Sequence, residues 1–322
     1  PPLEGDIRSS VVIVGGGFSG LHTGLRLALA GKKVVLLEAS RIAWAASGRN
    51  GGQAIVGFAC GQEPLEQQLG KAQARVAWDM SLQSINLIAE RFREFQIDCD
   101  WVKGYLHVAD CARKARALEQ DTLALQRDYD FVSEFVRGPA VQQHIQSPRY
   151  CAAAFDTTSG HLHPLKYGLG LARAAQALGV KIFEKSAVIG LERGEQVRAR
   201  TSEGEVKAKY VVLAGNCTLP EFGPQVAPEL GPRIMPVGTY MIGTAPLSDA
   251  LCQSLIPSNA AVSDNNFILD YFRFRADQRL LFGGEVSYSA RTPSNLKTLM
   301  AKRMGRIFPQ LQGVPVDFVW GG

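Results

Sequence analysis

Residues 11–38 read VVIVGGGFSGLHTGLRLALAGKKVVLLE, and the rest of the chain is best interpreted outward from this segment. Its first four residues are β-branched, which predicts a strand buried on both faces, as in a parallel sheet. Leucines then recur at every fourth position, which predicts a helix with one apolar face. A second apolar run at residues 34–37 predicts another buried strand. Strand, helix and strand within about thirty residues indicate a βαβ unit.

The turn between the first strand and the helix carries the pattern Gly15-x-Gly17-x-x-Gly20. The first glycine permits a tight turn, the second lets a pyrophosphate approach the backbone, and the third allows close helix–strand packing. The helix N-terminus then offers N–H groups and a positive dipole end to phosphates. Glu38 ends the second strand, where a carboxylate can accept hydrogen bonds from ribose hydroxyls. It disfavours a 2′-phosphate but does not distinguish NAD from FAD; a glycine-rich turn with a surface glutamate is the structural alternative.

Residues 43–61 are rich in small residues with little periodicity, so they form either a functional loop or a disordered segment. Within them, residues 45–53 read AASGRNGGQ. An NAD-dependent dehydrogenase usually continues into further α/β units here, whereas a flavoprotein needs a loop that runs along the pyrophosphate towards the isoalloxazine ring. Arg49 can offset phosphate charge, and Asn50 and Gln53 offer amide groups to the ring edges. The alternative is a flexible surface loop.

Taken together, these segments resemble the D-amino-acid oxidase-like FAD-dependent oxidoreductases, and within them the γ-glutamylputrescine oxidoreductase branch. Four later segments agree in their order along the chain: GHLHPLKY at 160–167, LAGN at 213–216, DYFR at 270–273 and LLFGG at 280–284. The resemblance covers nearly the whole chain and implies FAD as the cofactor. No second glycine-rich βαβ unit is visible, so a nicotinamide cofactor is not expected.

The glycine motif and the resemblance together predict the following cofactor-binding residues: Gly15, Gly16, Gly17, Phe18, Ser19, Gly20, Glu38, Ala39, Ser47, Arg49, Asn50, Gly51, Gly52, Gln53, Val188, Ala214 and Gly215. By resemblance, Val188 lies on a strand and clamps the adenine with its backbone, while Ala214 and Gly215 close over the FAD.

The resemblance also implies that the antiparallel half of the chain covers the flavin and holds the substrate. The candidate substrate-binding residues are Tyr240, Tyr271 and Arg273, and for each of them a packing or surface role is an equally open alternative. No catalytic residue is assigned, because an amine that binds deprotonated needs no protein base.

The implied reaction is oxidation of a C–N bond in an amine or amino-acid-like substrate of the γ-glutamylputrescine type. Hydride passes from the carbon beside nitrogen to flavin N5, the imine product hydrolyses, and dioxygen or another acceptor reoxidises the flavin. Two alternatives stay open: a flavin dehydrogenase that reduces a protein or quinone, and a non-catalytic FAD-binding protein. The sequence leaves open the identity of the amine, covalent attachment of the flavin and the oligomeric state.

The expected fold is α/β, or α+β overall, with a Rossmann-like FAD-binding domain interleaved with an antiparallel-sheet substrate domain. Residues 1–90 and 150–222 are expected to form the first domain, with 317–322 starting its return segment. Residues 91–149 and 223–316 are expected to form the second. Five prolines between residues 220 and 236 mark the crossing between them.

Periodicity predicts the individual elements. Helices are expected at 70–95, 164–179 and 294–307, a hairpin of strands at 197–201 and 206–209, a separate buried strand at 210–215, and antiparallel strands over 237–288. A strand at 316–320 is expected to enter the FAD domain beside its parallel sheet. A C-terminal portion is expected to be missing after it, which would impair catalysis by leaving the flavin uncovered.

Composition excludes several classes of protein. With 46% hydrophobic residues among 322, the chain can bury a large core and is not globally disordered. The net charge of +5 is scattered among acids, which argues against a nucleic-acid partner. No apolar run approaches the ~20 residues that span a membrane. Six cysteines without CxxC or zinc-type spacing predict a cytoplasmic protein with reduced thiols and no metal site.

Overall fold

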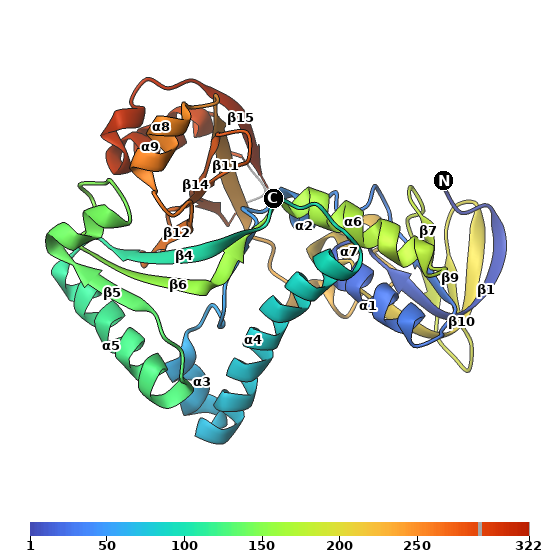
Figure 1. Ribbon diagram of the computed structural model, residues 1–322. Coiled ribbons are helices and arrows are strands. Elements are labelled where there is room, and N and C mark those ends of the chain that lie inside the picture. The colour runs from blue at the N-terminus through green and yellow to red at the C-terminus, as the bar shows by residue number, and fades with distance from the viewer. Residues whose placement is uncertain (289–291, 322) are drawn as a thin grey trace. The chain divides into compact units, whose positions relative to one another are not determined.

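The computed structural model describes residues 1–288 and 292–321, and the chain divides into two compact units (Figure 1). Unit 1 comprises Pro1–Asn50, Arg91–Cys99 and Pro164–Pro236. Unit 2 comprises Gly51–Glu90, Asp100–His163 and Val237–Gly322.

These units are interleaved along the chain, but their boundaries differ from the expected domains. Residues 51–90 and 150–163 belong to unit 2, because the short strand Gln53–Ala54 pairs with residues 160–161 in the sheet of that unit. Residues 91–99 and 223–236 belong to unit 1. The chain therefore enters unit 2 about forty residues earlier than its periodicity suggests.

Unit 1 is built on a six-stranded sheet with strand order β7-β2-β1-β10-β9-β8. The strands are β1 (Gly5–Val14), β2 (Val34–Leu37), β7 (Lys181–Phe183), β8 (Gly190–Glu192), β9 (Val197–Arg200) and β10 (Gly204–Leu213). The first four strands in this order pair in parallel, and β10, β9 and β8 pair in antiparallel fashion. This sheet contains the predicted βαβ unit.

One expectation about this sheet is wrong. Residues 206–209 and 210–215 are not separate strands, because β10 runs without a break from Gly204 to Leu213. Its first half pairs with β9, while its other edge pairs with β1 from Gly204 to Leu213. Parallel pairing along one edge keeps both halves in a single strand.

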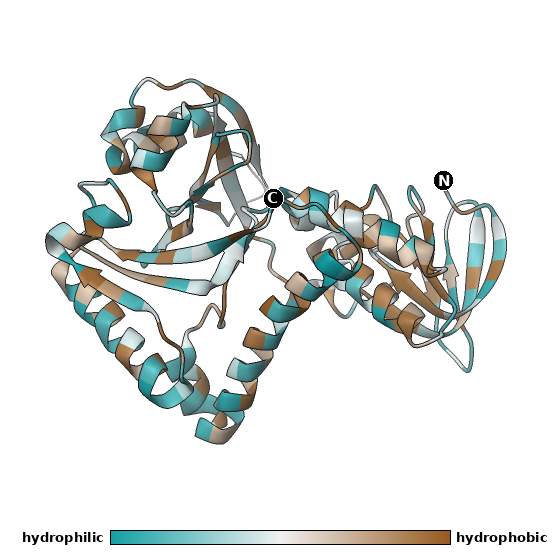
Figure 2. Ribbon diagram, viewed as in Figure 1, coloured by the Kyte–Doolittle hydropathy of each residue, from teal (hydrophilic) through white to brown (hydrophobic). Residues whose placement is uncertain are grey.

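The two faces of this sheet carry alternate side chains of the same strands. Val12 and Val14 of β1 pack into a buried cluster with Leu219 and Val226, whereas Ile13 points to the other face, towards α1. Figure 1 shows α1 (Phe18–Leu29) and α6 (Pro164–Ala177) side by side on this second face. In Figure 2 the strands of the unit 1 sheet accordingly carry brown, hydrophobic segments. The two shorter helices of unit 1 are α2 (Ala46–Arg49) and α7 (Leu219–Phe222).

Unit 2 is built on a nine-stranded sheet with strand order β15-β11-β14-β13-β12-β4-β6-β3, and β5 also pairs with β6. The strands are β3 (Gln53–Ala54), β4 (Val102–Ala109), β5 (Glu134–Arg137), β6 (Ala152–His161), β11 (Gly238–Thr244), β12 (Ala261–Asp264), β13 (Tyr271–Phe274), β14 (Leu280–Ser287) and β15 (Val316–Gly321). Antiparallel pairing prevails, as expected, and β12 with β4 is the parallel exception among the described pairs.

Five helices accompany this sheet: α3 (Gln62–Leu69), α4 (Lys71–Glu94), α5 (Ala112–Tyr129), α8 (Asp249–Leu255) and α9 (Leu296–Ile307). The last four residues of α4 belong to unit 1. The helices expected at 70–95, 164–179 and 294–307 are confirmed as α4, α6 and α9. Along the described residues, no helix combines the length and apolar character that a membrane crossing requires.

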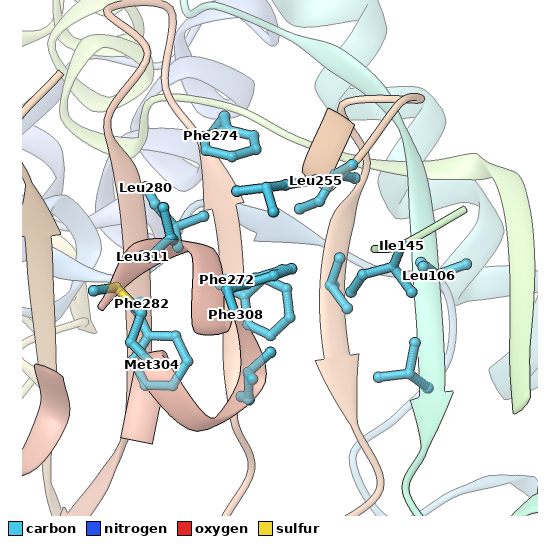
Figure 3. Close-up of a cluster of buried hydrophobic side chains, with 14 of the residues drawn as sticks. Leu106, Ile145, Leu255, Phe272, Phe274, Leu280, Phe282, Met304, Phe308 and Leu311 are labelled. Carbon is cyan, nitrogen blue, oxygen red and sulfur yellow. The ribbon is translucent and has the colours of Figure 1, made fainter. Parts of the chain in front are cut away.

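The core of unit 2 lies between one face of the sheet and α9 with its neighbouring segments. Figure 3 shows Phe272 and Phe274 of β13, Phe282 of β14 and Phe308 gathered on this face. The ring centroids of Phe272 and Phe308 are 5.2 Å apart in an edge-to-face arrangement. Because successive side chains of a strand alternate, Tyr271 and Arg273 project from the opposite face of β13.

The strand expected at 316–320 exists, but its expected location is wrong. It is β15, and it pairs with β11 in unit 2, with Trp320 opposite Met241. It therefore does not enter unit 1 or lie beside the parallel sheet. Val316 packs into the core of unit 2, which holds the strand there. Gly322, the last residue of the expected return segment, lies outside the described residues.

Candidate functional site

The turn between β1 and α1 requires glycine at two positions. Gly15 has a positive φ of 112°, and a Cβ there would lie 2.5 Å from the carbonyl oxygen of Ala214. A Cβ on Gly20 would overlap the carbonyl oxygen of Gly15. A side chain at Gly15 would collide with the end of β10, and one at Gly20 would push α1 away from the end of β1.

The first turn of α1 leaves backbone donors open. Within the described segments, the N–H groups of Gly17, Ser19 and Gly20 have no acceptor, while Phe18 N–H donates to Ser47 Oγ at 3.0 Å. Such donors and the helix dipole together make a site for an anionic group. Ser47 lies directly over Gly17, where a Cβ would come within 2.8 Å of Ser47 Oγ.

The Glu38 carboxylate accepts two backbone hydrogen bonds, one of them from the glycine-rich turn. Its Oε2 accepts the Gly16 N–H at 2.6 Å, and its Oε1 accepts the Ser40 N–H at 2.8 Å. Each carboxylate oxygen has a further lone pair, so the half-buried group can still accept hydrogen bonds from a diol. Ala39, next in the chain, is also half-buried.

Residues 43–50 are ordered rather than a disordered loop. Ala46–Arg49 form the short helix α2, and Arg49 stacks over the Trp44 ring with 4.4 Å between the guanidinium carbon and the ring centroid. Arg49 Nε donates to the Trp44 carbonyl at 2.8 Å, and Asn50 Nδ2 donates to the carbonyls of Ala46 and Ser47. The side chains of Arg49 and Asn50 therefore stabilise the conformation of residues 44–50 through hydrogen bonds to its backbone carbonyls.

Three further predicted cofactor residues lie in unit 1. Val188 is buried in the connection between β7 and β8 rather than on a strand, and its backbone N–H and C=O have no partner in the part of the chain described. Gly223 packs against the Val188 carbonyl so closely that a Cβ would overlap it. Ala214 and Gly215 follow β10, where the Ala214 N–H donates to the Val14 carbonyl at 2.7 Å.

The remaining predicted cofactor residues belong to unit 2, where their polar groups are engaged. The Gly51 carbonyl accepts Arg273 Nε, and the Gly52 carbonyl accepts the Leu162 N–H at 2.8 Å. Gln53 Nε2 donates to the Val262 carbonyl of β12 at 3.0 Å. The Gln53 side chain is therefore tied to β12 through Nε2, and its contact with the flavin ring stays a prediction.

The three predicted substrate residues fall on different faces of the unit 2 sheet. Tyr240 is 5% exposed and packs in the hydrophobic core with Phe272 and Phe282. Tyr271 and Arg273 are brought together on the other face. The structure therefore separates Tyr240 from the other two.

Tyr271 occupies a slot formed by two glycines. Its ring lies 3.0 Å from the position of a Cβ on Gly51, and a Cβ on Gly283 would overlap the ring. Thr239 hydrogen-bonds the hydroxyl, and burial raises the pKa of Tyr271 despite this bond. The ring is only partly buried, so it is the most accessible of the three candidates.

Arg273 is 3% exposed, and its guanidinium donates to three backbone carbonyls. These belong to Gly51, to Leu162 at 2.9 Å and to Phe274 at 3.1 Å. Burial is the main cause that lowers the pKa of Arg273, to about 10. Among the described residues no carboxylate forms a salt bridge with it, but Asp100 and Asp277 lie near enough to favour its charged form.

Sequence reasoning missed two residues beside this cluster. Gly283 forms one wall of the Tyr271 slot, and consecutive glycines inside a strand are a signal for such close approach. His161, opposite Gln53 in the β3–β6 pair, is 1% exposed and contacts the Asn259 carbonyl through Nε2 at 2.8 Å. Burial is the main cause that lowers its pKa to about 4, so it is neutral near pH 7.

The residues of unit 1 fit FAD. A dinucleotide needs donors for its pyrophosphate, an acceptor for its ribose hydroxyls and a backbone edge for its adenine. The open N–H groups of α1, the Glu38 carboxylate and the unpaired backbone of buried Val188 are groups of these three kinds.

Comparisons with known proteins agree with this chemistry. The family described as DAO, FAD dependent oxidoreductase, matches residues 10–322. Gamma-glutamylputrescine oxidoreductase of Escherichia coli (strain K12) is 41% identical over 320 residues, which cover 99% of this chain and 74% of that protein. The probable oxidoreductase OrdL of Haemophilus influenzae is 39% identical over 324 residues, with 100% and 74% coverage.

A solved structure shows the same fold. Glycine oxidase from Geobacillus kaustophilus superposes with a TM-score of 0.78 at 19% identity, covering 98% of this chain and 82% of that one. This likeness confirms the expected mixed α/β architecture. From the glycine-rich turn, the family match and these similarities, the chain belongs to the DAO family of FAD-dependent oxidoreductases.

Proposed function

We propose that this protein oxidises a C–N bond of a small amine or amino-acid-like substrate of the γ-glutamylputrescine type. The observation that carries this proposal is the 41% identity, over nearly the whole chain, to an oxidoreductase named for γ-glutamylputrescine. The bound FAD would supply the hydride acceptor. The protein supplies binding, orientation and exclusion of water.

Unit 1 would hold the cofactor by groups that are already in position. The N–H groups of Gly17, Ser19 and Gly20 would bind the pyrophosphate, and Glu38 would accept the ribose hydroxyls. The Val188 backbone would pair with the adenine edge.

The remaining cofactor contacts would follow the same chain segments. Arg49 and Asn50 would border the pyrophosphate and the flavin ring, and Ala214 and Gly215 would lie beside the bound cofactor. The supporting observation is that α2 and the end of β10 both adjoin the glycine-rich turn.

On the substrate side, Tyr271 is the strongest of the three predicted contacts. Its ring is held between two glycines and is partly accessible, whereas Tyr240 is in the core and the Arg273 guanidinium is engaged by carbonyls. No protein base is assigned, because a substrate amine that binds in its neutral form already has the lone pair that assists hydride departure.

Dioxygen is the proposed electron acceptor, and a protein or quinone acceptor is the alternative. We place the protein in the cytoplasm, because none of its six cysteines, all within described segments, forms a disulfide bond.

The decisive experiment is anaerobic mixing of the FAD-loaded protein with a panel of amines that includes γ-glutamylputrescine. Bleaching of the flavin absorbance by one of these amines is expected. A flavin that no amine bleaches would contradict the proposed oxidation and favour a binding-only role. Admission of air, compared with addition of an artificial acceptor, then separates an oxidase from a dehydrogenase, and NADH should not bleach the flavin.

A further inference from the structure

Two of the places where the chain passes between its units contact β13 on the face that carries Tyr271 and Arg273. Gly51 is the first residue of unit 2 after Asn50, and Leu162 lies two residues before Pro164, where the chain returns to unit 1. Both residues offer their carbonyls to the same guanidinium, that of Arg273. One side chain therefore anchors two of the chain crossings.

We propose that Arg273 is a positioning residue, which fixes the Gly51–Gln53 segment for flavin binding, rather than a substrate-binding residue. This inference rests on the proposed flavin chemistry, because it concerns the segment predicted to approach the flavin ring. It reassigns a residue that the sequence places among the candidates for substrate contact.

The geometry of the guanidinium supports this assignment. All three of its nitrogens donate, and their acceptors are the carbonyls of Gly51, Leu162 and Phe274. At 3% exposure the group has little surface left for a ligand. A planar guanidinium can reach carbonyls on separate segments from three nitrogens at once, whereas the three donors of a lysine ammonium all leave one nitrogen.

The free-energy cost of burying the Arg273 charge also supports a positioning role. A buried cation is expensive unless it is stabilised, and among the described residues no carboxylate forms a salt bridge with this one, while Asp100 and Asp277 favour its charge from further away. The hydrogen bonds of the guanidinium go to backbone carbonyls, and two of these belong to the segments where the chain passes between its units. Replacement would leave the Gly51 and Leu162 carbonyls buried without this donor.

The Gly51–Gln53 segment is held from other sides as well. The Tyr271 ring packs against Gly51, and the Leu162 N–H donates to the Gly52 carbonyl at 2.8 Å. Gln53 donates to the Val262 carbonyl. These contacts come from β13, β12 and the end of β6, so the segment is positioned by the sheet of unit 2 and not by its own composition.

The test compares Arg273→Lys and Arg273→Met with the matched control Arg275→Met. Arg275 lies one residue beyond the same strand, and its side chain is 30% exposed in an ion pair with Asp277. Each variant is prepared as the FAD-loaded protein, and FAD affinity is then measured with apoprotein. The visible spectrum, kcat and KM are measured with γ-glutamylputrescine and with N-acetylputrescine, which lacks the carboxylate.

A positioning role predicts about tenfold or greater loss of FAD affinity in both Arg273 variants, a typical consequence of losing charge-assisted hydrogen bonds. It also predicts an altered flavin spectrum and an equal fall in kcat for the two amines, with KM nearly unchanged. Arg275→Met should match the wild type in every measurement.

A substrate-binding role predicts a different pattern, which would overturn the proposal. FAD affinity and spectrum would stay at wild-type values in Arg273→Lys, and KM would rise only for the amine that carries a carboxylate. If no amine reduces the wild-type flavin, the proposed reaction fails, but FAD affinity and spectrum still decide the role of Arg273.

Should both Arg273 variants fail to fold, Gln53→Leu tests the same anchoring with a smaller change. It removes the hydrogen bond to the Val262 carbonyl and leaves Arg273 in place. A partial loss of FAD affinity with an altered spectrum is expected. Wild-type affinity and spectrum in Gln53→Leu would contradict the anchoring of this segment.

Discussion

Two glycine-containing segments, Gly15–Gly20 in unit 1 and Gly51–Gln53 in unit 2, look alike in sequence and behave differently in the structure. In the first, three N–H groups at the start of α1 have no acceptor among the described residues. In the second, two carbonyls and the glutamine amide are all bonded within unit 2.

The comparison shows that glycine content alone does not identify a ligand site. What distinguishes the segments is where their backbone polar groups find partners. Open donors at a helix N-terminus can bind an anion, whereas the two carbonyls and the side-chain amide of Gly51–Gln53 tie that segment to unit 2. Each of the following predictions perturbs one of these segments and leaves the other unchanged.

The largest effect is expected from Gly20→Ala. The new Cβ would overlap the Gly15 carbonyl, which is backbone and cannot rotate away. We expect a loss of about 3 kcal/mol or more in the free energy of unfolding, with loss of bound FAD. Chemical denaturation and flavin content measure both.

Gly24→Ala, on the same helix, is the control for Gly20→Ala. The nearest atom to its Cβ would be Ile13 Cδ1 at 3.4 Å, an ordinary contact. Its stability should be equal to or slightly above that of the wild type, because alanine favours helix by about 0.5–1 kcal/mol over glycine. Equal damage from both variants would show that the tight turn is not the cause.

The next largest effect is the pH dependence of stability that comes from His161, which lies opposite Gln53 of the Gly51–Gln53 segment. The pKa of His161 is lowered to about 4 from an ordinary 6.5, so the unfolded chain binds the proton more readily. Stability from this group is complete above about pH 6.5 and is lost as pH falls towards 4, by up to about 3 kcal/mol. His161→Gln should be less sensitive to acid in this window.

The measurement for His161 is the difference in unfolding free energy between variant and wild type from pH 4 to 7. Asp270 acts in the opposite direction, because its pKa is raised to about 6 and protonation below that pH favours the folded chain. Taking the difference at each pH removes this common contribution. A difference that is independent of pH would contradict the assignment to His161.

Gly283→Ala should have an intermediate effect on stability, through the contact of Tyr271 with the Gly51–Gln53 segment. Its Cβ would overlap the Tyr271 ring and displace it from Gly51, at about 1–3 kcal/mol. Combining it with Tyr271→Ala should cost less than the sum of the single changes, because the overlap disappears. A double-mutant cycle measures this coupling, and strict additivity would mean that the ring does not occupy the slot.

The smallest effect is expected from Glu38→Gln at the turn. The amide keeps the shape, but its nitrogen cannot accept, so one of the two backbone N–H groups, of Gly16 or Ser40, loses its acceptor and the bond to a ribose loses its charge; FAD should bind at least about tenfold more weakly. Glu184→Gln is the control, because Glu184 also accepts a backbone N–H, from Ile42 at 2.8 Å. Titration of apoprotein with FAD should separate the two variants; equal affinities would remove Glu38 from the site.

Local patterns were sufficient to predict the β1-turn-α1 segment and the helices α4, α6 and α9. Four β-branched residues, a glycine motif and an acid at the end of β2 act over short distances, so adjacent residues carry the information. The same patterns divided β10 into two strands, since its continuity comes from pairing with β1, nearly two hundred residues earlier.

The sequence alone was also sufficient for the cofactor and the family: the glycine spacing indicated a dinucleotide, and the resemblance carried by the later segments identified it as FAD. It could not place β15 or assign Arg273. Alternation along a strand predicts that Tyr271 and Arg273 share a face, but not which segment crosses that face. The segment that crosses this face is Gly51–Gln53. Gly51 and Arg273 are 222 residues apart in the sequence, and only packing of the folded chain brings the Gly51 carbonyl to the Arg273 guanidinium.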